Sequence, residues 1–427
     1  LRLPLVESDT VRLFVSADLL SASLAGDTVG LGVLDPSDVQ ISNLDTLTGF
    51  PWASAEATIT VDWTEPAAFS FVPDTGFRQN AALDDAGHVY VVYNGDPGGD
   101  FDILIRRSSD GGLTWGNEEN IVSDGSNEFF PDVVVGPSNA VGVAYYSTRD
   151  GQREEYMLTS SDFGDTWGPQ VRATTNDGDS RVCDLLYAND TLQMAWFDST
   201  PGNNQILYQT SPDFGQTWNP AVQVSTTTGD RSAVNPRLAA AGATIYCVWN
   251  EYLGDFQDAG NGAQVAYSYL PDGGAWATPI TLANVGASYA ATIAGTSDGR
   301  AYVAYQSNET GDYQIWMKSV KDGAIQGLEQ VTSALFAAGP SLQWSPSGRI
   351  DLLYQSAVDS GSSNIFHITR PTDFDAWSTP KDISKNTTTF SQAPVLLRNF
   401  ASGNMHAFWE DGRTGNTNIW YSQWIES

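Results

Sequence analysis

One eight-residue pattern recurs along this chain at a nearly constant interval, and it restricts the possible folds more than any other feature. The pattern S-x-D-x-G-x-T-W occurs in full at 108–115, 160–167 and 211–218. Its aspartates lie 52 and 51 residues apart. Weaker copies continue the series at 270–276, 321–323 and 372–377. A fixed interval of about 50 residues is typical of a protein built from one repeated structural unit.

Each repeat contains the same succession of short apolar runs separated by turn residues. Three runs come before the pattern and one follows it; in the second repeat they read FPDVVVG, AVGVAYYS, EEYMLTS and PQVRATT. No long stretch of the chain has the 3.6-residue period of an amphipathic helix, so the runs are expected to be β-strands. Four antiparallel strands in a unit that repeats in this way predict the blade of a β-propeller.

The chain contains seven such repeats. Their first strands are expected to begin near residues 78, 129, 180, 234, 288, 338 and 392. The seventh repeat ends at Ser427 without a fourth strand, and the run AAFSFV at 67–72 is in the right place to supply it. This pairing would close the ring and remove an open sheet edge. We therefore predict an all-β protein, with a seven-bladed β-propeller of four-stranded antiparallel blades at 67–427 and a short N-terminal β-rich extension at 1–66.

Composition excludes several classes of partner. Asp and Glu number 51 against 20 Lys and Arg, which gives a formal net charge of −31. Nucleic acids and anionic membranes need a basic surface, so neither is an expected partner. No run of about 20 apolar residues is present, so no transmembrane segment is expected. Cys183 and Cys247 lie in apolar runs of different repeats and are predicted to be buried, reduced and unpaired.

The repeated pattern resembles the Asp-box, or bacterial neuraminidase repeat, of sialidase-like β-propellers. The ending FWEDGRTGNTNIWYSQ also resembles repeats of secreted and cell-surface bacterial propellers. The resemblance implies that the boxes lie between the two outer strands, on the face opposite the usual active site. The aspartates should accept N–H bonds in a tight turn, and the tryptophans should pack between strands or blades. A structural role is therefore expected for Asp110, Trp115, Asp162, Trp167, Asp213 and Trp218.

Three arginines are expected near the central channel, where propeller ligands usually bind. Arg78, Arg181 and Arg237 lie close to the starts of the first strands of three repeats. Arginine can hold a carboxylate or sulfate by two parallel hydrogen bonds, and sialidases use an arginine triad for the carboxylate of sialic acid. The motif around Arg78 resembles their first-blade motif, with Gln-Asn where Ile-Pro is expected. The alternative is that the arginines pair with carboxylates such as Asp132 and Asp184.

The resemblance also implies which residues would act if the chain were a hydrolase. Sialidases use an aspartic acid near the start and a tyrosine nucleophile that a glutamate activates. Asp96 or Asp100 could take the first role, and Glu251 with Tyr289 the second. Arg181 and Arg237 do not align with the family's second and third triad positions, so we assign no catalytic residue. Contact between Glu251 and a tyrosine hydroxyl, with the arginines in one pocket, would favour the hydrolase.

Acidic, glycine-rich segments form a second class of candidate site. The segment NGDPGGDFD contains Asp96, Asp100 and Asp102. Calcium prefers oxygen ligands on such turns, so calcium binding is possible here, although no cofactor is required. The alternative is a solvated turn, because the spacing is not that of an EF-hand.

Two classes of function follow from these observations. The first is a secreted or cell-surface, non-catalytic propeller that binds glycan or extracellular protein, or forms part of an extracellular assembly. The extension at 1–66 could support self-assembly by pairing with a neighbouring chain. The second is a sialidase-like exo-glycoside hydrolase.

Overall fold

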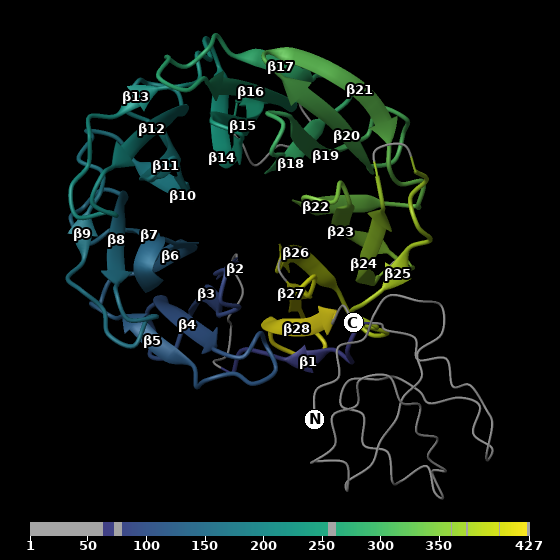
Figure 1. The fold of residues 1–427 in the computed structure, drawn as a ribbon, viewed down its shortest axis with the longest axis horizontal. Helices are drawn as coiled ribbons and strands as arrows, with labels where there is room; N and C mark the ends of the chain where they lie inside the picture. The colour runs from purple at the N-terminus through teal and green to yellow at the C-terminus, as the bar shows by residue number, and fades with distance from the viewer. Residues whose placement is uncertain are drawn as a thin grey trace, which may run out of the picture.

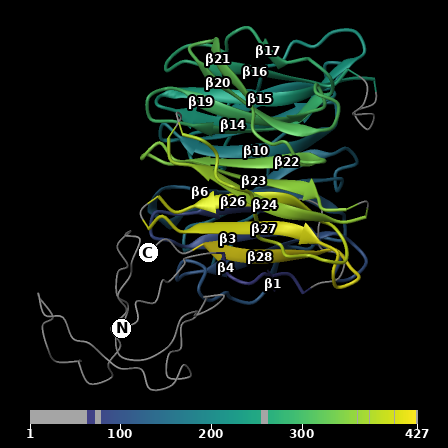
Figure 2. The same cartoon turned by 90° about the vertical axis from the view of Figure 1, so that its right-hand side faces the viewer.

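The fold is a closed ring of seven β-sheets around a central channel (Figure 1). The computed structural model describes residues 63–71, 79–254, 262–359, 361–372, 375–400 and 402–424. Every sheet has four strands, and neighbouring strands in each sheet are antiparallel. Seen from the side in Figure 2, the strands run between the two faces of the ring. The predicted all-β, seven-bladed propeller is therefore confirmed.

The first four blades follow the chain in order, from the channel outward. Blade 1 contains β2 (Asn80–Leu83), β3 (Val89–Gly95), β4 (Asp102–Ser108) and β5 (Glu119–Val122). Blade 2 contains β6 (Glu128–Val135), β7 (Val141–Ser147), β8 (Glu154–Ser160) and β9 (Val171–Arg172), with one 3-10 turn, η2 (Pro137–Asn139). Blade 3 contains β10 (Ser180–Ala188), β11 (Thr191–Asp198), β12 (Gln205–Ser211) and β13 (Val222–Gln223). Blade 4 contains β14 (Arg231–Ala241), β15 (Thr244–Leu253), β16 (Gln264–Leu270) and β17 (Ile280–Ala283).

The remaining blades complete the ring. Blade 5 contains β18 (Ser288–Gly295), β19 (Ala301–Ser307), β20 (Gln314–Lys321) and β21 (Ala324–Gln330). Blade 6 contains β22 (Ala337–Trp344), β23 (Ile350–Ala357), β24 (Ser363–Arg370) and β25 (Lys381–Asp382). Blade 7 contains β26 (Ser391–Arg398), β27 (Met405–Asp411), β28 (Asn418–Trp424) and the N-terminal strand β1 (Ala67–Ala68). The inner strands begin within three residues of the predicted positions.

The N-terminal segment closes the ring on blade 7. Ala67 pairs with Tyr421 and Ala68 with Trp420, so the predicted source of the missing strand is confirmed. Contacts with blade 7 begin before β1, because Trp63 forms a β-bridge to Trp424 and is only 1% exposed. The predicted extension at 1–66 lies largely outside the described residues.

The repeated turns have one hydrogen-bond pattern. Asp162 accepts bonds from the Ser160 hydroxyl at 2.7 Å, the Thr166 amide at 2.9 Å and the Thr166 hydroxyl at 2.6 Å. These bonds lower the pKa of Asp162 to about 2, and the bond from the Thr166 hydroxyl makes the largest contribution. Asp110 and Asp213 accept the same set of bonds in their own turns. Each carboxylate therefore fastens the hairpin between the third and fourth strands of its blade.

The tryptophans of these turns pack toward the preceding blade. Trp115 of blade 1 contacts Tyr421 of blade 7, with ring centroids 5.2 Å apart. Trp167 joins a cluster that contains Tyr90 of blade 1, and Trp218 joins one that contains blade 2 residues. These half-buried indoles add apolar contact between neighbouring sheets, at the outer side of the ring.

Two further expectations concern the thiols and membrane segments. Cys183 and Cys247 are both free and buried, as predicted. The described residues contain no helix with the length and apolar character needed to cross a membrane.

Candidate functional site: the central channel

The channel contains a cavity that residues of every blade surround. Its volume is about 800 Å³, and the inner strands of all seven blades line it. Arg181, Arg237 and Tyr289 line this cavity together, as the sequence led us to expect of channel residues. Arg78 lies outside the described residues.

A repeated bulge shapes the wall of the channel. In β6, β10, β14, β18, β22 and β26 the pairing register shifts at one point. One residue there has a positive φ between 51° and 57° in each strand: Phe130, Val182, Asn235, Ala290, Gly339 and Ala393. A β-bulge turns the following side chains, so residues such as Asp132 and Asp184 face the channel.

The side chains that follow the bulges join adjacent blades. Asp132 of blade 2 accepts the amide hydrogen of Leu185 in blade 3 at 2.6 Å, and Asp184 of blade 3 accepts that of Leu238 in blade 4 at 2.7 Å. Burial raises the pKa of Asp132 to about 7, and the nearby charge of Asp184 adds to the increase. These carboxyl groups hold the inner wall of the ring together.

Arg237 and Arg181 both pair with carboxylates. Arg237 Nη1 lies 2.7 Å from Asp184 Oδ1, and Arg181 Nη2 lies 3.0 Å from Asp179 Oδ2. The Arg181 guanidinium also lies 5.7 Å from the ring centroid of Phe197. The structure therefore brings the two arginines to one cavity, where Arg237 pairs with Asp184 and Arg181 shares Asp179 with Arg153.

Glu251 is held inside its own blade. Its Oε1 accepts the indole N–H of Trp249 at 2.9 Å, and its Oε2 accepts the amide of Gln264 at 2.6 Å. Trp249 lies in β15 and Gln264 in β16, so the carboxylate links the second and third strands of blade 4. None of its hydrogen bonds among the described residues goes to a tyrosine hydroxyl.

Carboxylates at the same position of other blades have the same environment. In β11, Asp198 accepts the indole N–H of Trp196 at 3.2 Å. In β27, Asp411 accepts that of Trp409 at 3.1 Å. The three sites share the order tryptophan, any residue, acid near the end of the second strand. We call this arrangement the Trp-acid latch.

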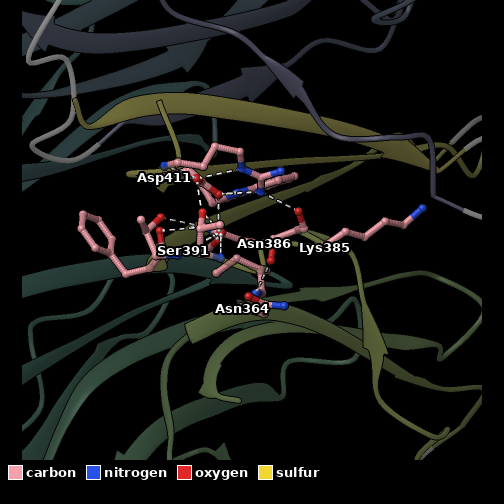
Figure 3. A network of polar contacts seen from close by, with 12 residues as sticks. Asn364, Lys385, Asn386, Ser391 and Asp411 are labelled. Carbon is pink, nitrogen blue, oxygen red and sulfur yellow. Dashed lines mark hydrogen bonds and ion pairs between the residues drawn. The ribbon is translucent and has the colours of Figure 1, made fainter. Parts of the chain in front are cut away.

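Figure 3 shows the latch of blade 7, in which polar side chains converge on Asp411. Its carboxylate accepts bonds from the Ser391 hydroxyl at 2.7 Å and the Asn386 amide at 3.1 Å. Arg413 Nη2 lies 2.7 Å from it, and the Asp411 side chain has no solvent exposure. Asn386 precedes β26 and Arg413 follows β27, so the carboxylate holds together the loops that contain these two residues.

Tyr289 lines the cavity and interacts with other polar side chains there. Its hydroxyl interacts with Tyr313 and Gln306, and burial raises its pKa to about 12. An activated nucleophile needs an adjacent base or a lowered pKa. Neither feature is found at Tyr289 among the described residues.

The acidic segment of blade 1 lies in the β3–β4 loop and the start of β4. Asp96 accepts the amide hydrogen of Gly99, and Asp102 accepts a bond from the Asn120 amide at 2.5 Å. Burial raises the pKa of Asp102. The described residues contain no group of three or more His, Cys, Asp and Glu that could hold a metal ion. Asp96, Asp100 and Asp102 are thus not gathered into such a group, and calcium binding stays a prediction.

Five aromatic residues line the cavity: Phe130, Tyr146, Phe197, Tyr252 and Tyr289. Sequence reasoning named Tyr289 among them and missed the other four. They come from the starts of inner strands or the ends of second strands, which meet at one end of the channel. Aromatic residues recur at these strand ends in the sequence, and this recurrence could have predicted an aromatic channel mouth.

Comparison with known proteins shows similarity at the level of the fold. No protein-family model matches the chain, and no curated protein matches its sequence. An ulvan lyase, a polysaccharide lyase solved with a bound glycan, matches with a TM-score of 0.58 and 12% identity over 84% of this chain and 95% of its own. An α-L-arabinofuranosidase from Fusarium graminearum, solved with arabinobiose, matches with a TM-score of 0.52 and 15% identity over 85% and 98%. A Dyadobacter fermentans protein of unknown function matches with a TM-score of 0.51 and 13% identity, over 73% of this chain and 99% of its own.

Proposed function

We propose that this protein is a secreted or cell-surface, non-catalytic β-propeller that binds glycan at the mouth of its central channel. One observation carries the proposal: five aromatic side chains line the same 800 Å³ cavity as Arg181, Asn235 and Arg237. Concave sites with aromatic walls and a few polar groups suit a ligand that has both apolar and hydroxyl-bearing faces, as sugars do.

The non-catalytic assignment rests on the contacts of the expected catalytic residues. Glu251 is engaged in a Trp-acid latch, and Tyr289 has a raised pKa. Features of a catalytic site act as a unit, so loss of one costs orders of magnitude in rate. A sialidase-like hydrolase remains the alternative.

The structural neighbours support a glycan ligand by analogy. Two similar propellers were solved with saccharides bound. Because function depends on the site rather than on the fold, this support is weaker than that of the cavity itself.

A glycan array with purified protein tests the proposal, with and without calcium. Tyr289→Ala removes an aromatic side chain of the mouth. Tyr187→Ala is the matched control, because Tyr187 lies near the opposite end of its inner strand and contacts Phe214. We expect array signals that the first variant loses and the second keeps.

Two results would contradict the proposal. The first is the absence of any bound glycan. The second is release of a fluorogenic leaving group from a sialoside or arabinoside by the wild-type protein, which would favour the hydrolase.

A further inference from the structure

Aromatic contacts continue from the channel mouth into neighbouring blades at two places. We name them the blade 2 row and the blade 5 row after the blades at their centres. In the blade 2 row, Phe101 contacts Phe129 with centroids 5.2 Å apart, and Phe129 contacts Tyr146 at 5.5 Å. Tyr146 stacks on Phe130 at 5.6 Å. This row leads from the β3–β4 loop to the cavity.

The blade 5 row lies on another part of the ring. Tyr252 contacts Tyr289 with centroids 6.2 Å apart, and Tyr289 contacts Tyr313 at 5.5 Å. Tyr313 contacts Phe336 at 6.1 Å, just before the inner strand of blade 6. This row therefore runs from the cavity across three blades.

Both rows reach the same cavity. Phe130 and Tyr146 line it from blade 2, and Tyr252 and Tyr289 line it from blades 4 and 5. In Figure 1, β6 lies across the channel from β18, so the two rows approach the mouth from different sides. Together they extend well beyond the space that one sugar would occupy.

Most members of the rows keep part of their surface accessible. Phe101, Phe129 and Phe130 in the blade 2 row are half-buried. Tyr289 and Tyr313 in the blade 5 row are half-buried as well. Rings held by neighbours on one side and open on the other lose little conformational entropy when a ligand stacks on them.

The charge of the protein favours neutral extended ligands over anionic ones. The chain has a formal net charge of −31, which repels polyanions at long range. At the mouth, Arg237 is paired with Asp184, and Arg181 shares Asp179 with Arg153. The carboxylates beside these arginines would repel an anionic sugar, whereas a neutral sugar is not repelled.

We propose that the channel mouth binds an internal segment of a neutral polysaccharide, laid across the channel so that successive sugars contact both aromatic rows. This inference rests on the proposed function, and it names the ligand as an extended, uncharged glycan chain. A terminal sugar inserted alone, as an exo-acting enzyme would bind it, uses only the residues that line the cavity.

Isothermal titration with neutral oligosaccharides of increasing length tests the inference. The probes are cello-, manno-, galacto- and arabino-oligosaccharides from two to eight sugars, with oligogalacturonates as anionic counterparts. For at least one neutral series we expect affinity to rise about tenfold or more between the disaccharide and the octasaccharide.

Variants at the outer parts of the two rows show whether both are used. Phe129→Ala and Tyr313→Ala should each weaken octasaccharide binding by about three- to tenfold, the range of one aromatic contact, with little effect on the disaccharide. Phe129→Leu keeps an apolar side chain and separates loss of the ring from loss of packing. Melting temperatures of all variants identify any that fail to fold.

Each alternative outcome has a separate meaning. Equal affinity for short and long chains, or unchanged octasaccharide binding by both alanine variants, would overturn the inference and leave the proposed function standing. Tighter binding of oligogalacturonates than of neutral chains would show that the ligand is not a neutral glycan. Failure of every glycan to bind would overturn the inference and the proposed function together.

Discussion

Replacement of Glu155 by glutamine should change the pH dependence of stability, because this carboxyl group is buried without a matching partner. Glu155 belongs to β8, and both of its carboxyl oxygens are buried without a hydrogen bond of normal geometry. Burial raises its pKa to about 8; the amide and thiol of Cys183 oppose the increase, and the charge of Asp132 adds to it. The neutral acid is therefore the form that the folded protein prefers.

The sign of the effect follows from the raised pKa. A carboxyl group with a folded pKa of about 8 and an ordinary value of 4.5 contributes its full stability below pH 4.5. Between these values the unfolded chain has released the proton and the folded chain retains it. Stability from this group therefore falls by about 1.4 kcal/mol per pH unit, or at most about 4 kcal/mol between pH 5 and 8.

Denaturant unfolding at pH 5, 6, 7 and 8 measures this contribution. Because glutamine does not titrate, the difference in unfolding free energy between Glu155→Gln and wild type should shift steadily in favour of the variant as pH rises. Taking the difference removes the contributions of the other acids. Parallel stability curves over this range would refute the reasoning, whichever protein is the more stable.

Further predictions concern the latch, the turns, the ring closure and the thiols. Asp411→Ala should destabilise the fold by about 3–5 kcal/mol in denaturant unfolding, because it leaves buried polar groups unpaired. Asp162→Ala should lower the melting temperature with little change in glycan affinity on the array; lost binding at unchanged stability would contradict this. Trp63→Ala should cost about 3–5 kcal/mol, since the side chain is 1% exposed. Cys183 and Cys247 should react with a thiol reagent only after unfolding; rapid labelling of the native protein would contradict their burial.

Much of the fold could be predicted because the repeat is local. The strands of each blade lie close together in sequence, and the turn pattern recurs in six of the seven repeats, so its interval of about 51 residues locates the inner strands. Closure was predictable for a related reason: a last repeat that lacks one strand leaves an edge to cover, and the run around Ala67 lies directly before the first blade. The bulges were not predictable, because no shared residue type marks the positive φ of Val182 or Ala290.

The site was harder to predict because its residues come from different blades. Arg237 pairs with Asp184, which lies 53 residues earlier, and only the ring places the two together. The role of Glu251 could have been recognised, since a tryptophan precedes it by two residues just as one precedes Asp198 and Asp411. The reading of Glu251 as a candidate activating glutamate came instead from the resemblance to sialidases.

The central claim is that glycan lies across the channel mouth and is not cleaved there. The most direct test is a crystal structure of the protein with the longest neutral oligosaccharide that binds in the titrations. We expect an intact chain with sugar rings facing Phe130 and Tyr289. A sugar bound on the face of the repeated turns, or a cleaved product in the channel, would contradict it.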